Sequence, residues 1–346
     1  MAKNKSQFSI AIESFWVRPW ARRCFYMLVI LYVCAILADF ISPYRFDDED
    51  RNYSYCPATN VEFFDQGRLS WPFVYGRTLS FDANHKRIFL TDHAKKYPLQ
   101  LFSHGHLFGV DKPGRIYIWG ADARGRDMFS RLMHGARISL SIGLLGSLIS
   151  FSLGLLIGGV AGYFGGWVDS VLMRICEMLM LVPSFYLMLA LRSVVPDNIS
   201  ALQIYFMVIL ILSFLGWASL ARIIRGMSLS LRQRDFVLAA KSLGVSDIRI
   251  IFTHILPHTL SYSLVAIMLT IPSYILLEAG LSLFGLGIQD PIPSWGNMLS
   301  DAMGIVQIQF APWIMIPGAF IFITVICFNI VGDALRDAFD PMLKEG

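Results

Sequence analysis

Residues 235–257 read DFVLAAKSLGVSDIRIIFTHILP, and this charged segment lies between two long apolar stretches. Its first part, Asp235 to Leu243, contains no proline or glycine, so two helical turns are expected there. Gly244 suits the position just beyond a helix, where the backbone turns left-handed. Ser246 suits the start of a second short helix, which Pro257 is expected to end. The segment therefore predicts a helix, a glycine elbow and a second helix.

The composition of the whole chain indicates an integral membrane protein. Of its 346 residues, 55% are hydrophobic and 16% are charged, and the mean hydropathy is +0.55. An ordinary soluble domain carries about 25% charged residues. Several apolar stretches approach the roughly 20 residues that cross a bilayer as a helix. We expect an all-α polytopic membrane protein with six transmembrane helices, at about residues 24–41, 138–163, 171–194, 200–220, 259–284 and 312–331.

The basic residues predict the orientation of these helices. Residues 1–23 contain several lysines and arginines and one acid, Glu13, and residues 222–249 form the densest basic loop between apolar stretches. Both segments are expected on the cytoplasmic side by the positive-inside bias. Four expected membrane crossings separate the two segments, and an even number of crossings returns the chain to the same side. A cleaved signal peptide is the weaker interpretation of the first apolar stretch, because no small-residue cleavage site follows it.

The chain is thereby divided into four parts. We expect a cytoplasmic N-terminal segment at 1–23, a first transmembrane helix at 24–41, a periplasmic insert at 42–130 and a five-helix core at 131–346. The core contains the cytoplasmic loop at 222–257, and both termini are expected in the cytoplasm. The five cysteines show no paired spacing, so neither a disulfide framework nor a zinc site is predicted.

The insert is expected to be a small folded subdomain, because it is too long for a connector and too aromatic for a disordered segment. The alternating pieces 87–91 and 115–119 are candidate strands. Four histidines raise the alternative of a metal site: His85, His93, His104 and His106. No cysteine or acid lies near them at ligand spacing, so exposed loop histidines are the preferred interpretation and no metal is predicted.

Two features of the apolar stretches concern packing and function. Small residues recur at intervals of four in the second stretch, which lets two helix backbones approach closely: Gly146, Ser150, Gly154, Gly158 and Gly162. Glu278 lies within the fifth stretch. A carboxylate inside a membrane is either functional or paired with a neighbouring helix, and the sequence leaves both interpretations open.

The polar segment has two interpretations from its residues alone. Ala239 and Ala240 would give its first helix a low surface that suits a groove on a partner protein. Alternatively the helix lies flat on anionic membrane lipid with its basic residues at the rim.

A resemblance favours the first interpretation. The pattern Ala239-Ala240, Gly244 and Leu256-Pro257 resembles the EAA loop of binding-protein-dependent ABC importer permeases, with Leu238 in place of the usual glutamate. The stretches at 125–140, 162–169 and 278–296 are similar to dipeptide and oligopeptide permeases of the C-subunit branch. The long insert resembles the microcin C and oligopeptide permeases of the YejE kind.

The resemblance implies a permease subunit that forms half of the path for oligopeptides or peptide-like compounds across the bacterial inner membrane. It implies three partners: a homologous second permease, cytoplasmic ATPase subunits and a periplasmic peptide-binding protein. It makes 222–257 the coupling loop, with ATPase-docking residues Ala239, Ala240, Ser242, Leu243 and Gly244. Weaker candidates for the exterior gate or translocation path are Glu278, Ser294 and Trp295.

The chain contains no GxxxxGK[ST] phosphate-binding motif and no nucleophile–base set, so we expect a transport subunit and not an enzyme. ATP and Mg would be bound by the partner ATPase, and no nucleic acid is implied. The competing classes are an ion-coupled secondary transporter and a non-transporting membrane anchor or scaffold. An ion-coupled transporter is expected to show inverted repeats with broken, charged helices, and no such repeat is found.

Overall fold

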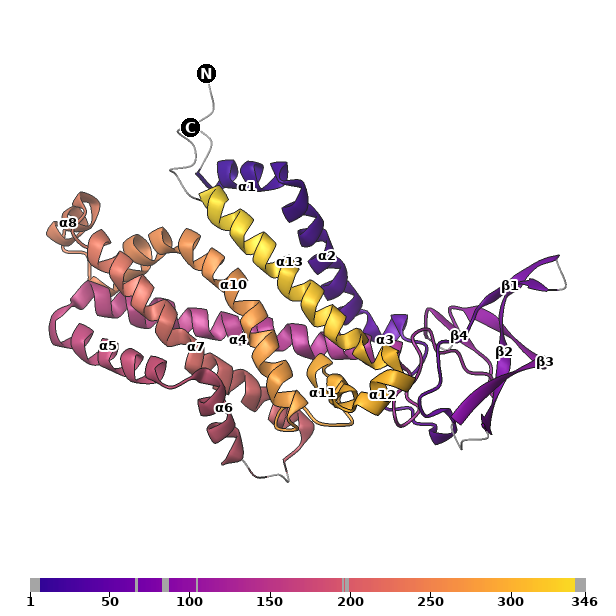
Figure 1. Ribbon diagram of the computed structural model, residues 1–346. Helices are drawn as coiled ribbons and strands as arrows, with labels where there is room; N and C mark the ends of the chain where they lie inside the picture. Colours follow the sequence, from indigo (N-terminus) through magenta and orange to yellow (C-terminus); the bar gives the residue numbers. More distant parts are fainter. Residues whose placement is uncertain are drawn as a thin grey trace, which may run out of the picture. The chain divides into compact units, whose positions relative to one another are not determined.

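The computed structural model describes residues 7–65, 68–82, 87–103, 105–194, 196 and 199–339, and most of them are helical (Figure 1). The chain forms two compact units. The first unit contains Met1–Leu28, Ser141–Glu278 and Ile323–Gly346, and the second contains Val29–Leu140 and Ala279–Phe322. The insert therefore lies within a larger unit.

Among the described residues, five helices are long and apolar enough to cross a membrane: Pro19–Ile36 (α2), Met128–Phe164 (α4), Ala201–Leu231 (α7), Asp247–Leu283 and Pro312–Phe339. The expected all-α fold with several spans and a small sheet is confirmed. Most of these helices extend beyond the apolar stretches. For example, α7 continues to Leu231, so the first third of the 222–257 loop is helix.

The third expected span is broken, which corrects the prediction of one continuous helix at 171–194. Gly166–Leu181 (α5) and Ser184–Ser193 (α6) meet at a bend of 87°. Pro183 causes the break, because a proline disfavours helical backbone at the residue before it. Val182 accordingly has φ −87° and ψ 124°, which is extended. In the described part of the chain the number of candidate spans is five, or six if this bent pair counts as one span.

Pro257 does not end a helix, contrary to the expectation from sequence. Asp247–Ile250 (α9), a π-helical turn at Ile251–Ile255 (η2) and Leu256–Leu283 (α10) form one continuous helix. In the π turn, the amide of Leu256 donates to the carbonyl of Ile251, five residues back. Such a turn widens the helix where a proline would otherwise clash with the preceding turn.

Within the first unit, the small-residue stripe of α4 packs against α7. A Cβ atom added at Gly158 would lie 2.4 Å from the carbonyl oxygen of Ala221, and one at Gly162 would lie 2.5 Å from that of Arg225. These two helix backbones therefore touch without an intervening side chain, as the spacing predicts. Ser150 donates to the Ser213 carbonyl of α7 at 3.0 Å and extends the same contact.

The insert contains one four-stranded antiparallel sheet with the order β1-β2-β3-β4 (Figure 1). Its strands are Glu62–Asp65 (β1), Arg68–Phe81 (β2), Arg87–Leu101 (β3) and Phe108–Val110 (β4). The candidate strand at 87–91 is the start of β3. The candidate at 115–119 is wrong, because these residues form no strand. There the amides of Ile116 and Tyr117 donate to the side chains of Tyr44 and Thr59, at 2.8 and 3.1 Å, instead of to a sheet.

Short helices complete the two units. The first unit contains Gln7–Val17 (α1) and Asp235–Ser242 (α8), and the second unit contains Ala38–Ile41 (α3), Arg51–Tyr53 (η1), Trp295–Ser300 (α11), Asp301–Met303 (η3), Ile305–Phe310 (α12) and Pro312–Met315 (η4). Ile316–Phe339 (α13) follows η4. The helices between α10 and α13 stand where the sequence predicts a loop.

The α4–α7 contact predicts that Gly158→Val destabilises the protein. Its side chain would collide with backbone, which cannot move aside as a flexible side chain can, so a loss of about 1–3 kcal/mol is expected. Gly226→Ala is the matched control, because no atom lies within 4 Å of a Cβ at this α7 position. The melting temperature of the purified membrane protein should fall for the first variant and hold or rise for the control. Equal melting temperatures would contradict the backbone contact.

Candidate functional site

The segment predicted to dock a partner has the helix–elbow–helix form that its sequence indicates. Helix α8 ends in a Schellman motif: the amide of Val245 donates to the Ala240 carbonyl at 3.1 Å, and that of Gly244 donates to the Lys241 carbonyl at 3.0 Å. Gly244 has φ +74°, in the left-handed region. No atom lies within 4 Å of a Cβ there, so the requirement for glycine comes from the backbone angle alone.

The two alanines of this segment lie on different faces of α8, which corrects the expectation of one shared partner-facing surface. Ala240 is 7% exposed and packs with Val237 in a cluster that includes Ile250 and Ile255 of the following helix. Ala239 is exposed. A residue at every third or fourth position of a helix shares a face, so burial of positions 237 and 240 turns position 239 outward.

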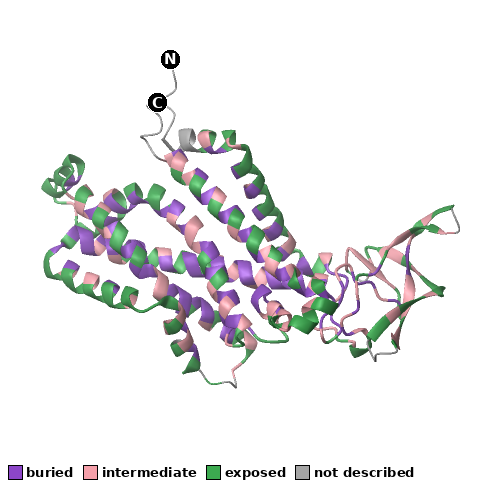
Figure 2. Ribbon diagram, in the orientation of Figure 1, coloured by how far each residue is buried: buried purple, intermediate pink, exposed green. Residues whose placement is uncertain are grey.

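The outward surface of this segment, which we call the coupling face, is partly apolar. It comprises Leu238, Ala239, Ser242, Leu243 and Ile248, all exposed, and Leu243 is 83% exposed. Figure 2 shows α8 as mostly exposed. Leu238, which stands in place of the usual glutamate of the EAA loop, is exposed on this face, so this position presents an apolar side chain that cannot form an ion pair.

The coupling face is fixed to the ends of the spans by polar contacts that sequence reasoning missed. Arg232 donates to the carbonyls of Tyr163 and Gly162 at the end of α4, at 3.2 and 3.5 Å. The Tyr163 hydroxyl in turn donates to Asp247 at the start of α9. Arg232 is therefore a cation at a helix C-terminus, where the unsatisfied carbonyls favour positive charge. The sequence signal for this helix end was Gly165, which directly follows α4 and has a left-handed φ of +66°.

A second clamp joins α5 to α7 in the same unit. Arg225 pairs with Asp169 through both nitrogens of its fork, and the Nε–Oδ1 distance is 2.8 Å. Such bidentate pairs restrict orientation more than single ion pairs do. The coupling segment thus follows a helix, α7, that is held on one side by α4 and on another by α5.

The second unit contains a buried cluster of arginines and acids near the start of α4, which we call the arginine cluster. Arg126 Nε donates to Asp122 at 2.7 Å, and its Nη1 donates to Asp290 at 3.0 Å. Arg131 Nη2 donates to the same Asp290 oxygen at 3.0 Å. The sequence contained a signal for this cluster that the sequence analysis did not use, because Asp122, Arg126 and Arg131 lie within ten residues of one another.

Asp127 lies beside this cluster and is fully buried. One of its oxygens accepts from the Ser130 amide at 2.7 Å, and the other has no hydrogen-bond partner. Burial, with a smaller contribution from the negative charge of Asp122, raises the pKa of the Asp127 carboxyl to about 7, although hydrogen bonds from Ser130 oppose the rise.

The candidate gate residues are placed as follows. Ser294 caps α11 by accepting from the Asn297 amide at 3.1 Å. Trp295 is fully buried; its indole donates to the Leu132 carbonyl at 3.2 Å and its amide donates to Ser139 at 3.1 Å. These contacts hold α11 against the first turns of α4 within the second unit.

Glu278 is also fully buried, in α10 of the first unit. The role of Glu278, Ser294 and Trp295 in a gate or path stays a prediction, and all three side chains are buried.

The histidines of the insert give no metal site among the described residues, where no group of three His, Cys, Asp or Glu side chains comes together. His93 stacks edge-on against Tyr75, and His106 lies 3.1 Å from the Asp39 carbonyl oxygen. His85 and His104 lie outside the described residues.

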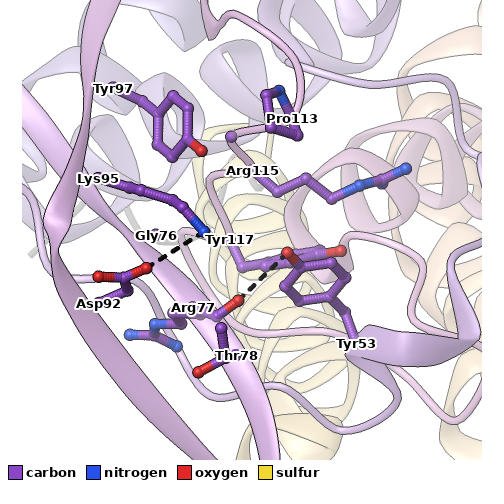
Figure 3. Close-up of a pocket in the computed structure, with 11 residues that line it drawn as sticks. Tyr53, Gly76, Arg77, Thr78, Asp92, Lys95, Tyr97, Pro113, Arg115 and Tyr117 are labelled. Atoms are coloured by element: carbon purple, nitrogen blue, oxygen red, sulfur yellow. Dashed lines mark hydrogen bonds and ion pairs between the residues drawn. The ribbon is translucent and has the colours of Figure 1, made fainter.

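A small pocket of about 140 Å³ lies between β2, β3 and the loop after β4 (Figure 3). Its charged groups are paired within the insert. Lys95 lies 3.3 Å from Asp92, and Arg77 donates to the carbonyl of Pro57 at 2.6 Å. Arg115 forms ion pairs with Asp48 and Asp50. The side chains around the pocket therefore connect it to neighbouring segments of the insert.

Comparison with known proteins assigns the chain to a family. Residues 154–345 match the family described as binding-protein-dependent transport system inner membrane component. The chain is 39% identical over 246 residues to the oligopeptide transport system permease protein OppC of Bacillus subtilis, which covers 70% of this chain and 78% of that protein. The chain belongs to this family of membrane-embedded transport permeases.

Two further relatives agree. The dipeptide transport system permease protein DppC of Bacillus subtilis is 40% identical over 234 residues, covering 67% of this chain and 71% of that protein. OppC of Haemophilus influenzae is 41% identical over 226 residues, covering 65% and 70%. The resemblance to peptide permeases that the residues indicated is confirmed.

The elbow geometry predicts the response to substitution at Gly244. Gly244→Pro fixes φ near −65° and should unravel the end of α8, whereas Gly244→Asn should keep it, because asparagine tolerates the left-handed region. Hydrogen exchange of the α8 amides checks this: protection should fall in the proline variant alone. Equal protection in both variants would contradict the elbow.

The raised pKa of Asp127 predicts a pH-dependent stability. Between the unfolded pKa of about 4 and the folded pKa of about 7, the folded protein holds a proton that the unfolded chain releases. Stability should therefore fall as pH rises through this window. Asp127→Asn stays neutral, so its melting temperature should match wild type at pH 4.5 and exceed it at pH 8. A constant difference at both pH values would contradict the assignment.

Proposed function

We propose that this chain is one permease half of an ATP-driven, binding-protein-dependent importer of oligopeptides or peptide-like compounds. The observation that carries the proposal is the coupling face: an exposed, partly apolar surface on a rigid helix–elbow–helix segment that is clamped to the ends of α4 and α7. A rigid attachment transmits a push from a bound partner to the spans, whereas a flexible loop would absorb it.

The proposed partners follow from this geometry and from the family. The coupling face docks a cytoplasmic ATPase subunit through Leu238, Ala239, Ser242 and Leu243. A homologous second permease supplies the other half of the path, and a periplasmic peptide-binding protein delivers the substrate. Both termini and the 222–257 loop lie in the cytoplasm, and the insert lies in the periplasm. ATP and Mg are bound by the ATPase and not by this chain.

The proposed mechanism is alternating access. ATP binding draws the two ATPase subunits together, and each carries one coupling face with it. Because α7 is held by α4 and α5 at Gly158, Gly162 and the Arg225–Asp169 pair, the spans move as a body and not one by one. ATP thus biases a two-state equilibrium by binding one state better than the other.

The proposal predicts that Leu243→Asp uncouples the ATPase. Leu243 is 83% exposed, so the folded chain should tolerate the change, while a carboxylate in an apolar docking groove should cost binding. Copurification of the ATPase with the permease should fall about tenfold or more. Leu69→Asp is the matched control, since Leu69 of β2 is 80% exposed. Unchanged copurification in the Leu243 variant would contradict docking at this face.

Reconstitution separates the proposal from its rivals. Vesicles that contain the two permeases, the ATPase and the binding protein should take up a peptide only when ATP is present on the side of the membrane where the ATPase is bound. Uptake by this chain alone, driven by a proton gradient, would establish an ion-coupled transporter instead. Absence of uptake under every condition, with the complex intact, would favour an anchor or scaffold.

A further inference from the structure

The second unit contains a cavity of about 760 Å³ beside the sheet of the insert. All three residues of strand β4 line it, and the remaining lining comes from the segment 43–50, the turn before β4 and the loop after it. Every one of these residues belongs to the second unit. The volume falls within the roughly 300–1,000 Å³ that ligand sites usually occupy.

The cavity follows the open edge of the sheet. β4 is the last strand in the order β1-β2-β3-β4, so one of its sides has no neighbouring strand. Phe108 and Val110 point to one face of the sheet and position 109 to the other, yet all three line the cavity. Gly109 can contribute only main chain, and no atom lies within 4 Å of a Cβ there. The main chain of β4 is therefore open to the cavity.

The register of β4 shows which of its main-chain groups lack a partner strand. The Phe102 amide donates to the carbonyl of Leu107, directly before β4, at 2.9 Å. In an antiparallel pair, residues bonded to the neighbouring strand alternate with residues whose amide and carbonyl point away from it. Gly109, two positions after Leu107, is therefore bonded to β3, and the amides and carbonyls of Phe108 and Val110 point to the open edge. Among the described residues, neither forms a backbone hydrogen bond outside the sheet.

Four charged side chains of the cavity are already bonded within the insert. Arg115 forms ion pairs with Asp48 and Asp50, at 3.2 and 3.4 Å. Asp111 accepts from the Gln100 side chain at 2.5 Å. The groups left for a ligand are main-chain donors and acceptors, repeated every second residue along an extended strand. Another extended peptide chain presents the same groups at the same spacing, and adding a strand to a sheet edge is a known mode of peptide recognition.

The length of the edge decides which kind of peptide chain fits. β4 has three residues, and a strand rises about 3.4 Å per residue, so the edge offers a ladder of roughly 10 Å. A short free peptide can pair over that length inside the cavity. A stable contact between two proteins needs roughly 800 Å² from each partner, which is more than such an edge provides.

We propose that β4 binds a short peptide as an added strand in this cavity, through the amides and carbonyls of Phe108 and Val110. The inference rests on the proposed function, which supplies peptides as the substrate, and it adds a peptide site on the permease itself. The Phe108 ring lies 6.2 Å from the Phe129 ring of α4, centroid to centroid, so the site is attached to a long apolar helix. Recognition through main-chain groups tolerates varied side chains, which suits a transporter of varied sequences.

The test measures peptide binding to the assembled complex of two permeases and ATPase in lipid nanodiscs. The binding protein is left out, so its own peptide site does not contribute. The probes are fluorescently labelled tetraalanine and the same peptide methylated on all its main-chain amide nitrogens, which removes the donors and keeps the side chains. The wild-type complex should bind tetraalanine about tenfold or more tightly than the methylated form.

Two variants at one position separate main chain from side chain. Val110→Pro removes the edge amide and keeps the bonds between β3 and β4, because that amide does not serve the ladder. Affinity for tetraalanine should fall about tenfold. Val110→Ala is the matched control: it shortens the side chain and keeps the amide, so affinity should hold. Equal hydrogen-exchange protection of the Gly109 amide in both variants shows that the sheet is intact.

Gly109→Trp tests the same site by a different route. No atom lies within 4 Å of a Cβ at this position, so a large side chain can enter the open space without collision and should block peptide binding. If Val110→Pro disrupts the sheet, this variant decides, with its melting temperature as the control for folding.

Two outcomes overturn the inference. One is equal affinity of the wild-type complex for tetraalanine and its methylated form. The other is unchanged peptide affinity in folded Gly109→Trp; if that variant instead loses affinity for the binding protein, the edge docks a protein and not a free peptide. Failure of the proposed function is distinct, because the complete wild-type importer would then show no ATP-dependent peptide uptake, whatever its peptide affinity.

Discussion

The backbone contact between α4 and α7 is the constraint on which the rest of the first unit depends. Gly158 and Gly162 leave no room for a Cβ against the carbonyl oxygens of α7, so the two helices meet at a fixed point. Because the contact is made by backbone, it has little freedom to relax. Arg232 then closes the end of α4, and Tyr163 reaches the start of α9. The packing of α4 against α7 therefore determines the position of α8.

The second unit depends on a different interaction, the burial of paired charges. Arg126 and Arg131 share Asp290, which ties the loop after α10 to the first turns of α4. Buried ion pairs contribute little net stability, but they penalise any arrangement that leaves one partner unpaired. The cluster thus specifies one arrangement of these segments.

Sequence reasoning was most accurate where local chemistry decides the structure. The elbow at Gly244 follows from the left-handed angle that glycine adopts, and the small-residue stripe of α4 follows from helical periodicity. Sequence reasoning was wrong where the surrounding helix decided how a proline is accommodated. Pro257 lies in a continuous helix because a π turn precedes it, whereas Pro183 breaks the third span, which was expected to be continuous over 171–194. Both sites contain a proline, and the local sequence does not show which proline a π turn accommodates and which one breaks the helix.

The amino-acid sequence by itself determined that this is a helical membrane protein, since apolar length and charge asymmetry are local properties, and its resemblance to peptide permeases at residues 125–140, 162–169, 235–257 and 278–296 indicated the family. It also predicted the helix–elbow–helix form of residues 235–257. Only the tertiary structure decided which residues of that segment face outward: Ala240 is buried because the following helix folds back over α8, and Leu243 is exposed because nothing does. Likewise, Arg131 and Asp301 are 170 positions apart, and only the folding of the second unit brings both to the wall of one cavity.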